Sequence, residues 1–510
     1  MTPRSVLRHR RLAAAAAIAA LAAGLSLHGA PSPAVAATTF TTPVELPQSA
    51  GLGEPSMALD SAGRLFATAP QSLGNITGGG SPVWTSTTQG STWGQPVAPQ
   101  GDPVSGGDTD VTVDGAGDVF QTDLWLGNSA MALSTDLGQS FVANEFGHVQ
   151  PGDDRPWLAY SGKDNVLYLA YDGADAIHVA HTLPLSPPQA GLTMPFDIPA
   201  VPESIIACSG GCGTLLDTLN TRECVCPPGG IAVDQSTGSV YLSYSKQNGG
   251  GNGGGVGIAR SDDGGFTWSY FSVPGTGSSG SAFDTEWNFD PIKVDSQGNV
   301  YVAWGESQKV TTDSNGNEVA TGGVLVKYSW SSDHGQTWHA PVTLSTTTGE
   351  NVFPTMDVVS PGVIDVAWYG AGGSGDPNQL PASTQWDVMF TQVTGAASAP
   401  AFTPQVAVSG IHQGCIQSGG LASCPDRGLL DFFQLVVDHA GMADIVYTAG
   451  QQGSGTVPAT NLFFVRQAGS TATASPSASA TPGTGLHGRG SGKGKGPKPH
   501  SATFRAFLSF

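Results

Sequence analysis

Charged side chains are scarce in this sequence, and positively charged ones are the scarcest. Only 12% of the 510 residues are charged, with 20 Lys and Arg against 40 Asp and Glu. Four of the basic residues lie before residue 37 and five after residue 467, and neither segment holds an acidic residue, so the body between them has a net charge near −29. A body this acidic repels phosphate backbones, which argues against nucleic acid as a partner.

Sustained helical periodicity is absent, and long apolar runs are nearly so. Gly and Pro are abundant instead, at 71 and 36 residues, which is typical of many short strands joined by turns. The one long apolar run, LAAAAAIAALAAGLSL, follows four arginines and precedes Ala34-Val35-Ala36. We predict a signal peptide over residues 1–36 and a secreted protein without a transmembrane anchor; an uncleaved anchor is the alternative.

Cysteine is scarce as well, and its six residues fall into two groups. These are Cys208, Cys212, Cys224 and Cys226, and then Cys415 and Cys424. An even number in an exported chain predicts disulfides, with Cys415 paired to Cys424 and the other four paired among themselves. A zinc site is the alternative for the first group, although its C-x₃-C and C-x-C spacing fits zinc poorly.

What the sequence does have is repetition. Residues 261–268 read SDDGGFTW and 331–338 read SSDHGQTW, with looser copies STTQGSTW at 86–93 and STDLGQSF at 134–141. The pattern S-x-D-x-G-x-T-W predicts a turn in which Ser and Asp bond the backbone, Gly adopts a positive φ and Trp packs between repeats. We therefore expect three aspartates to be structural and not catalytic: Asp136, Asp263 and Asp333.

Pairs of alternating apolar strands joined by a tight turn recur as a longer unit. Seven such pairs lie at residues 57–69, 111–123, 157–172, 231–245, 292–305, 356–370 and 435–450. A third strand follows each pair, and a fourth follows the box, as in WHAPVTLS from Trp338. The last unit ends at its third strand, NLFFVRQ, and FTTPVELP at 40–47 supplies a matching fourth. We predict an all-β fold, a β-propeller of seven four-stranded blades over residues 37–467, in which the N-terminal strand closes the last blade.

The four boxes resemble the Asp-boxes, or BNR repeats, of sialidases and their relatives. GEPSMALD (53–60) and DDRPWLAY (153–160) are also similar to segments of secreted bacterial sialidase-like propellers, so the resemblance covers residues 40–467. It implies a secreted glycoside hydrolase of the exo-α-sialidase type, acting on terminal sugars such as sialic acid. Two departures weaken a direct transfer: the family's Arg-Ile-Pro signature is absent, and true sialidases have six blades, which remains the alternative count here.

The loops that lead into the inner strands, and those after the second strands, hold the candidate site residues. The resemblance implies three arginines that clamp the substrate carboxylate, a Tyr nucleophile activated by a Glu, and an Asp acid/base. The candidates are Arg155, Arg427 and Arg222 for the clamp, Tyr369 for the nucleophile, Glu286 or Glu306 for its activator, and Asp108, Asp153 or Asp154 for the acid. Each acid is alternatively a solvated loop charge, and Tyr369 alternatively caps a strand beside Trp368.

Two function classes remain open from the sequence. The first is the glycoside hydrolase, for which no cofactor is expected. The second is a non-catalytic propeller that binds glycan or protein, with a structural Ca²⁺ held by its carboxylates. We expect a monomer in either case. Residues 468–510 are rich in Ser, Thr, Ala, Pro and Gly, which predicts a disordered tail whose basic residues contact an anionic cell wall or the acidic body.

Overall fold

The computed structural model describes residues 38–469 with gaps at 72–79, 100–106, 126–127, 148–152, 174–175, 203–227, 247–254, 277–288, 309, 313–317, 321, 346–348, 374, 417–427 and 452–458. The chain divides into a compact unit over Met1–Thr471 and a second over Ala472–Phe510, and the second lies outside the described residues. The predicted signal peptide and the predicted disordered tail therefore stay predictions. No helix in the described part is long and apolar enough to cross a membrane.

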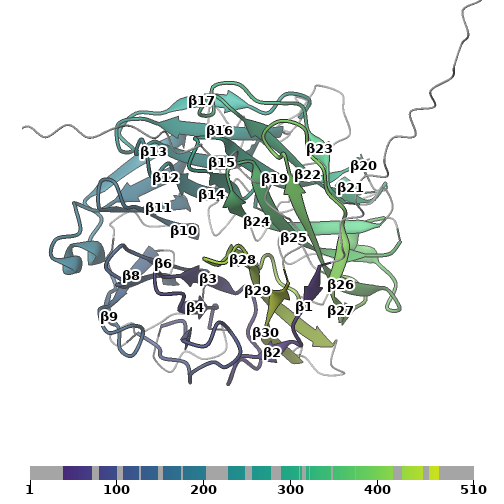
Figure 1. Ribbon diagram of the computed structural model, residues 1–510, viewed down its shortest axis with the longest axis horizontal. Helices are drawn as coiled ribbons and strands as arrows, with labels where there is room; N and C mark the ends of the chain where they lie inside the picture. The colour runs from purple at the N-terminus through teal and green to yellow at the C-terminus, as the bar shows by residue number, and fades with distance from the viewer. Residues whose placement is uncertain are drawn as a thin grey trace, which may run out of the picture. The chain divides into compact units, whose positions relative to one another are not determined.

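Antiparallel sheets of three or four strands make up the first half of the described chain (Figure 1). The first sheet contains β3 (Ser56–Leu59), β4 (Leu65–Thr68) and β5 (Val83–Ser86), and the second contains β6 (Thr109–Val113), β7 (Val119–Trp125), β8 (Asn128–Ser134) and β9 (Val142–Asn144). The third contains β10 (Asp154–Ser161), β11 (Val166–Asp172), β12 (Ala176–His181) and β13 (Phe196–Pro202), and the fourth contains β14 (Pro228–Val233), β15 (Val240–Lys246), β16 (Gly255–Ser261) and β17 (Ser269–Ser272).

The second half continues the pattern. One sheet joins two groups of four strands through a single parallel pair, Val324 with Glu350. The groups are β18 (Ile292–Val294), β19 (Val300–Ser307), β22 (Val324–Ser331) and β23 (Val342–Thr343), and then β24 (Glu350–Ser360), β25 (Val363–Ala371), β26 (Gln385–Thr394) and β27 (Gln405–Gln413). A ribbon of β20 (Val310–Thr312) and β21 (Glu318–Ala320) and the short 3₁₀ helix η2 (Pro377–Gln379) lie between these strands in the chain. Another short 3₁₀ helix, η1 (Pro188–Leu192), lies between β12 and β13 of the third sheet. The all-β prediction is confirmed.

The N-terminal segment pairs with the last strand of the described chain. The final sheet contains β28 (Gln434–Val437), β29 (Ala443–Gln451) and β30 (Ala459–Ala468), and both β1 (Thr39–Phe40) and β2 (Val44–Glu45) pair with β30. In register, Val44 lies opposite Phe464. Leu46 follows β2 and is fully buried. Residues more than 400 positions apart in sequence therefore share one sheet.

Hydrophobic cores lie between successive sheets. Phe66 of β4 packs with Val111 and Val119 of the second sheet, for example. In another cluster, Met57 and Leu65 of the first sheet pack with three residues of the last, Val446, Leu462 and Phe464. The apolar positions that alternate along each strand fill these interfaces, because successive side chains of a strand point to opposite faces of its sheet.

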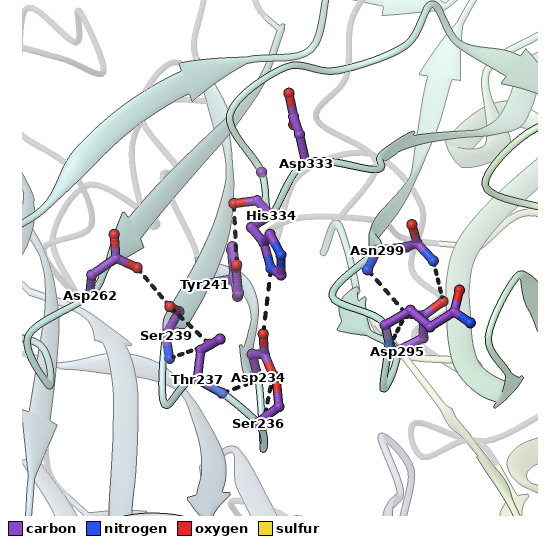
Figure 2. Close-up of polar contacts among 12 residues, drawn as sticks. Asp234, Ser236, Thr237, Ser239, Tyr241, Asp262, Asp295, Asn299, Asp333 and His334 are labelled. Carbon is purple, nitrogen blue, oxygen red and sulfur yellow. Dashed lines mark hydrogen bonds and ion pairs between the residues drawn. The ribbon is translucent and has the colours of Figure 1, made fainter.

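The boxes form the turns that their sequence predicts. In the fourth box, the Ser331 hydroxyl accepts a hydrogen bond from the Gly335 N–H (2.8 Å), and the Asp333 carboxylate accepts one from the Thr337 N–H (2.8 Å). Gly335 has φ +79°, which favours glycine. Figure 2 shows this turn against the preceding sheet: the Tyr241 hydroxyl donates to the His334 carbonyl (3.2 Å), and His334 Nδ1 lies 3.7 Å from Asp234 Oδ2.

The box glycines also let neighbouring sheets approach each other. A Cβ on Gly90 would overlap the Phe464 ring of the last sheet, and one on Gly138 would lie within 3.3 Å of the Phe66 ring of the first sheet. Gly335 lies against Tyr241 of the fourth sheet in the same way. A glycine is therefore needed at each of these positions, because it adopts a positive φ without strain and leaves room for the aromatic ring that covers it.

Candidate functional site

A cavity of about 250 Å³ lies where seven strands converge. Its lining comes from β3, β6, β10, β14, β18, β24 and β28, which we call the inner strands. The lining includes Trp157, Phe289 and Phe432, whose rings contact one another edge to face with centroids 5.0–5.6 Å apart. All three rings are buried.

Five of the inner strands are preceded or begun by a non-glycine residue with left-handed backbone. These residues are Glu54 (φ 51°), Arg155 (55°), Phe289 (55°), Phe353 (56°) and Leu430 (54°). Each such residue costs of order 1–3 kcal/mol, and strained residues of this kind concentrate at functional sites. Their recurrence at one position of the repeat marks this end of the inner strands as the candidate site.

Arg155 connects several of these segments. Its Nη2 lies 2.5 Å from Asp431 Oδ2, and its Nη1 lies 3.1 Å from Asp108 Oδ2 and 3.6 Å from Glu54 Oε1. Its guanidinium also lies 5.0 Å from the centre of the Phe289 ring. These partners precede β28, β6, β3 and β18, so one arginine on β10 joins the lead-in segments of four other inner strands.

The carboxylates around Arg155 differ in exposure. Asp431 is fully buried, and its backbone N–H donates to Glu54 Oε1 (3.1 Å). The Asp108 side chain keeps 15% of its surface exposed, as does that of Arg155. Asp154, next to Arg155 in the chain, is partly exposed and accepts a hydrogen bond from the Arg155 N–H (3.0 Å). We call these five residues, Glu54, Asp108, Asp154, Arg155 and Asp431, the Arg155 cluster.

Asp154 titrates unusually within this cluster. Burial raises the pKa of Asp154, the Asp108 carboxylate raises it further, and the opposing effect of Arg155 leaves it at about 6. Asp108 lies 3.1 Å from the Arg155 guanidinium. The cluster therefore places a carboxyl group that is protonated below about pH 6 near a second carboxyl group, and glycoside hydrolases use two carboxyl groups in different roles.

The structure places the other predicted catalytic residues away from Arg155 contacts. Asp153 is buried and accepts a hydrogen bond from the Ser129 hydroxyl (2.6 Å). Glu306 is buried, pairs with Lys327 and accepts from Trp304 Nε1 (3.1 Å). Their catalytic roles stay predictions that these contacts do not support.

Tyr369 lies inside a hydrophobic core. Its side chain has no exposed surface, its ring stacks on Phe433 with centroids 4.2 Å apart, and its hydroxyl accepts a hydrogen bond from the Thr448 N–H (3.1 Å). Burial raises its pKa, which keeps the hydroxyl protonated. This geometry supports a packing role, and the nucleophile assignment stays a prediction without structural support.

Several predicted residues lie outside the described part of the chain. They are Glu286, Arg222, Arg427 and all the cysteines except Cys415. The substrate clamp and the disulfide pairing thus remain predictions. Among the described residues, no group of three or more His, Cys, Asp or Glu side chains is arranged to hold a metal ion, and the Ca²⁺ alternative also remains a prediction.

Sequence reasoning overlooked two members of this site, Asp431 and Phe289. Asp431 stands in LLDFFQ, where the only signal was an acid among apolar residues just ahead of an inner strand. Phe289 follows the acidic pair Asp284 and Glu286 and reads as core. Their contacts with Arg155 depend on left-handed backbone at the positions that lead into the inner strands. Residues such as Glu54, Arg155 and Leu430 do not predict that conformation as a glycine would.

No protein-family model and no curated protein matches this chain. Similar solved structures include a protein of unknown function from Dyadobacter fermentans (11% identity, covering 84% of this chain and 99% of that one, TM-score 0.41). The phage phi92 endosialidase (10%, 87% and 71%, TM-score 0.43) and the NanB sialidase from Streptococcus pneumoniae (10%, 84% and 70%, TM-score 0.40) are also among them. The geometry of the Arg155 cluster, and not these likenesses, supports the function that we propose.

Proposed function

We propose that this chain is a secreted glycoside hydrolase that acts on terminal sugars of glycoconjugates at the Arg155 cluster. The observation that carries the proposal is the pair of partly exposed carboxyl groups, Asp108 and Asp154, beside the Arg155 guanidinium at the start of the inner strands. Sialic acid, the sugar that the sequence resemblance implies, is one substrate to test.

The two carboxyl groups have different roles in this proposal. Asp154 is protonated below about pH 6 and donates its proton to the leaving-group oxygen as the glycosidic bond breaks. Asp108, 3.1 Å from Arg155, accepts a proton from the water that attacks the anomeric carbon from the other side of the sugar. Asp431 and Glu54 hold the guanidinium in place, so Arg155 positions Asp108 and takes no proton itself.

The fold that supports this site is, in our proposal, a closed seven-bladed propeller. Each inner strand contacts the next one along the chain, from β3 through β6, β10, β14, β18 and β24 to β28, and β28 contacts β3. The pairing of β1 and β2 with β30 supports closure of the last blade by residues 40–47, because it joins the two ends of the described chain. Closure leaves few free sheet edges, which suits an exported monomer.

The test is hydrolysis of a panel of fluorogenic aryl glycosides by the full-length protein, covering neutral hexosides, pentosides and a sialoside. We expect at least one of them to be hydrolysed, and Asp154→Asn to lower kcat/KM by about 100-fold or more, as loss of a general acid does. Asp262→Asn is the matched control, because Asp262 is 59% exposed on a box turn and pairs with Arg260.

A non-catalytic glycan-binding propeller is the alternative, and the burial of Tyr369 favours it. In that case no glycoside in the panel is hydrolysed, whereas a glycan array shows binding that Asp108→Asn and Asp154→Asn weaken. Binding without turnover would thus reject the hydrolase proposal but support the Arg155 cluster as the glycan-binding site. Hydrolysis that survives both substitutions unchanged would reject the site.

A further inference from the structure

We infer that Arg155 is an internal counter-ion and not a ligand clamp, so the Arg155 cluster selects uncharged sugars over carboxylate-bearing ones. This inference rests on the proposed function and names its substrate class. It departs from the sequence expectation that Arg155 receives the carboxylate of an acidic sugar.

The guanidinium of Arg155 is already paired with protein carboxylates. A ligand carboxylate that binds arginine strongly uses two adjacent N–H groups in a bidentate pair. Here Nη2 lies 2.5 Å from Asp431, and Nη1 lies between Asp108 at 3.1 Å and Glu54 at 3.6 Å. The Phe289 ring covers a face of the guanidinium at 5.0 Å, and only 15% of the arginine side chain is exposed. A ligand carboxylate would have to displace a protein carboxylate.

The charge around Arg155 also disfavours an anion. Three carboxylates lie within 3.6 Å of this one guanidinium, and Asp154 adds a fourth acid beside it. A ligand carboxylate beside Asp108 would add one more negative charge to a site where, among the described residues, acids outnumber the one guanidinium. Like charges repel each other strongly in a partly buried site, which is a means of rejecting the wrong ligand.

An uncharged sugar fits the same groups. The exposed parts of Asp108 and Asp154 offer carboxyl oxygens that accept hydrogen bonds, and sugar hydroxyls donate them. Hydrogen bonds to charged acceptors are the stronger kind, so binding does not require a free cation. The specificity of the cluster thus follows from the internal pairing of Arg155, the one guanidinium that the described residues bring to it.

A substitution of Glu54 tests how far the negative charge around Arg155 disfavours a ligand carboxylate. Glu54 lies 3.6 Å from Arg155 Nη1, only 5% of its side chain is exposed, and in the proposed reaction it helps to hold the guanidinium but transfers no proton. Glu54→Gln removes one negative charge while keeping the shape of the side chain and an oxygen for the Asp431 N–H. Asp262→Asn removes a negative charge from an exposed box turn and is the matched control.

The experiment compares kcat/KM, or Kd where nothing is turned over, for neutral aryl glycosides, an aryl sialoside and an aryl glucuronide. We expect kcat/KM, or affinity, of the full-length protein to be about 100-fold or more higher for a neutral glycoside than for an acidic one. Glu54→Gln should lower this ratio at least tenfold, and Asp262→Asn should leave it unchanged. A sialoside or glucuronide that is used as well as any neutral sugar would overturn the inference and leave the hydrolase intact. If the protein binds neutral sugars without hydrolysing them, the inference is supported and the hydrolase is rejected. If it binds none of the sugars, both are overturned.

Discussion

At the scale of single residues, this protein buries carboxyl groups with few cationic partners. Asp365 on β25 has no exposed surface; Gln392 Nε2 donates to its Oδ1 (2.9 Å), and within the described part of the chain its Oδ2 has no hydrogen-bond partner. Burial raises the pKa of Asp365 to about 8, and the nearby Asp357 contributes. Asp365 is therefore protonated in the folded protein at neutral pH.

The stability contributed by Asp365 should depend on pH. The folded protein binds this proton more tightly than the unfolded chain, so its stability falls as pH rises from about 4 to about 8. We expect Asp365→Asn to leave stability unchanged at pH 4 and to raise it by roughly 1–3 kcal/mol at pH 8, because the amide needs no proton. Thermal unfolding at both pH values measures this, with the exposed Asp262→Asn as the control. Equal effects of Asp365→Asn at pH 4 and pH 8 would contradict it.

At the scale of elements, the box turns were the most predictable part of the fold. Their hydrogen bonds are local, joining residues no more than four positions apart, so the sequence pattern contains nearly all the information that the turn requires. The first box shows how much the pattern tolerates: Thr88 replaces the Asp, and its hydroxyl still accepts from the Thr92 N–H (2.9 Å). The lead-in segments were less predictable, because their partners lie up to 377 positions away, as Glu54 and Asp431 do.

The first box leads to a prediction for the fourth. Asp333 accepts hydrogen bonds from the Thr337 N–H and hydroxyl (2.8 and 2.6 Å) and from the Ser331 hydroxyl (2.7 Å). Asp333→Ala should lower the free energy of unfolding by about 1–3 kcal/mol. Asp333→Thr should recover part of that loss, because a Thr hydroxyl does the same work at Thr88. Urea unfolding of both variants measures these free energies. If Asp333→Thr is no more stable than Asp333→Ala, the fourth box does not tolerate the replacement found in the first.

At the scale of the whole molecule, the order of the sheets and the pairing of the chain's ends could be anticipated from repeats, whereas the site could not. FTTPVELP was predicted to join the last unit because it matched WHAPVTLS, and β2 does pair with β30. The site needed knowledge of which side chains converge from five separate segments. Of the nine residues predicted for it, Asp108, Asp154 and Arg155 come together, and three others are held elsewhere by Ser129, Lys327 and Phe433.

The proposed closure of the last blade by the N-terminal segment gives a prediction on global stability. Leu46 is fully buried in a core that contains residues of both the first sheet and the last. Leu46→Ala should therefore cost about 2–5 kcal/mol, as in other well-packed cores. Leu183→Ala is the control, because Leu183 is 54% exposed. If the two variants unfold at the same denaturant concentration, the N-terminal segment does not lock the molecule.

In our proposal Asp154 is the acid of a glycoside hydrolase, and the decisive experiment is the pH dependence of kcat/KM on a fluorogenic glycoside. With a pKa of about 6, Asp154 must be protonated to act, so activity should fall as pH rises above about 6, by about tenfold for each further unit. In Asp154→Asn that descending limb should disappear together with most of the activity. A rate that stays constant or rises between pH 6 and 8, or a limb that survives unchanged in Asp154→Asn, would contradict the account.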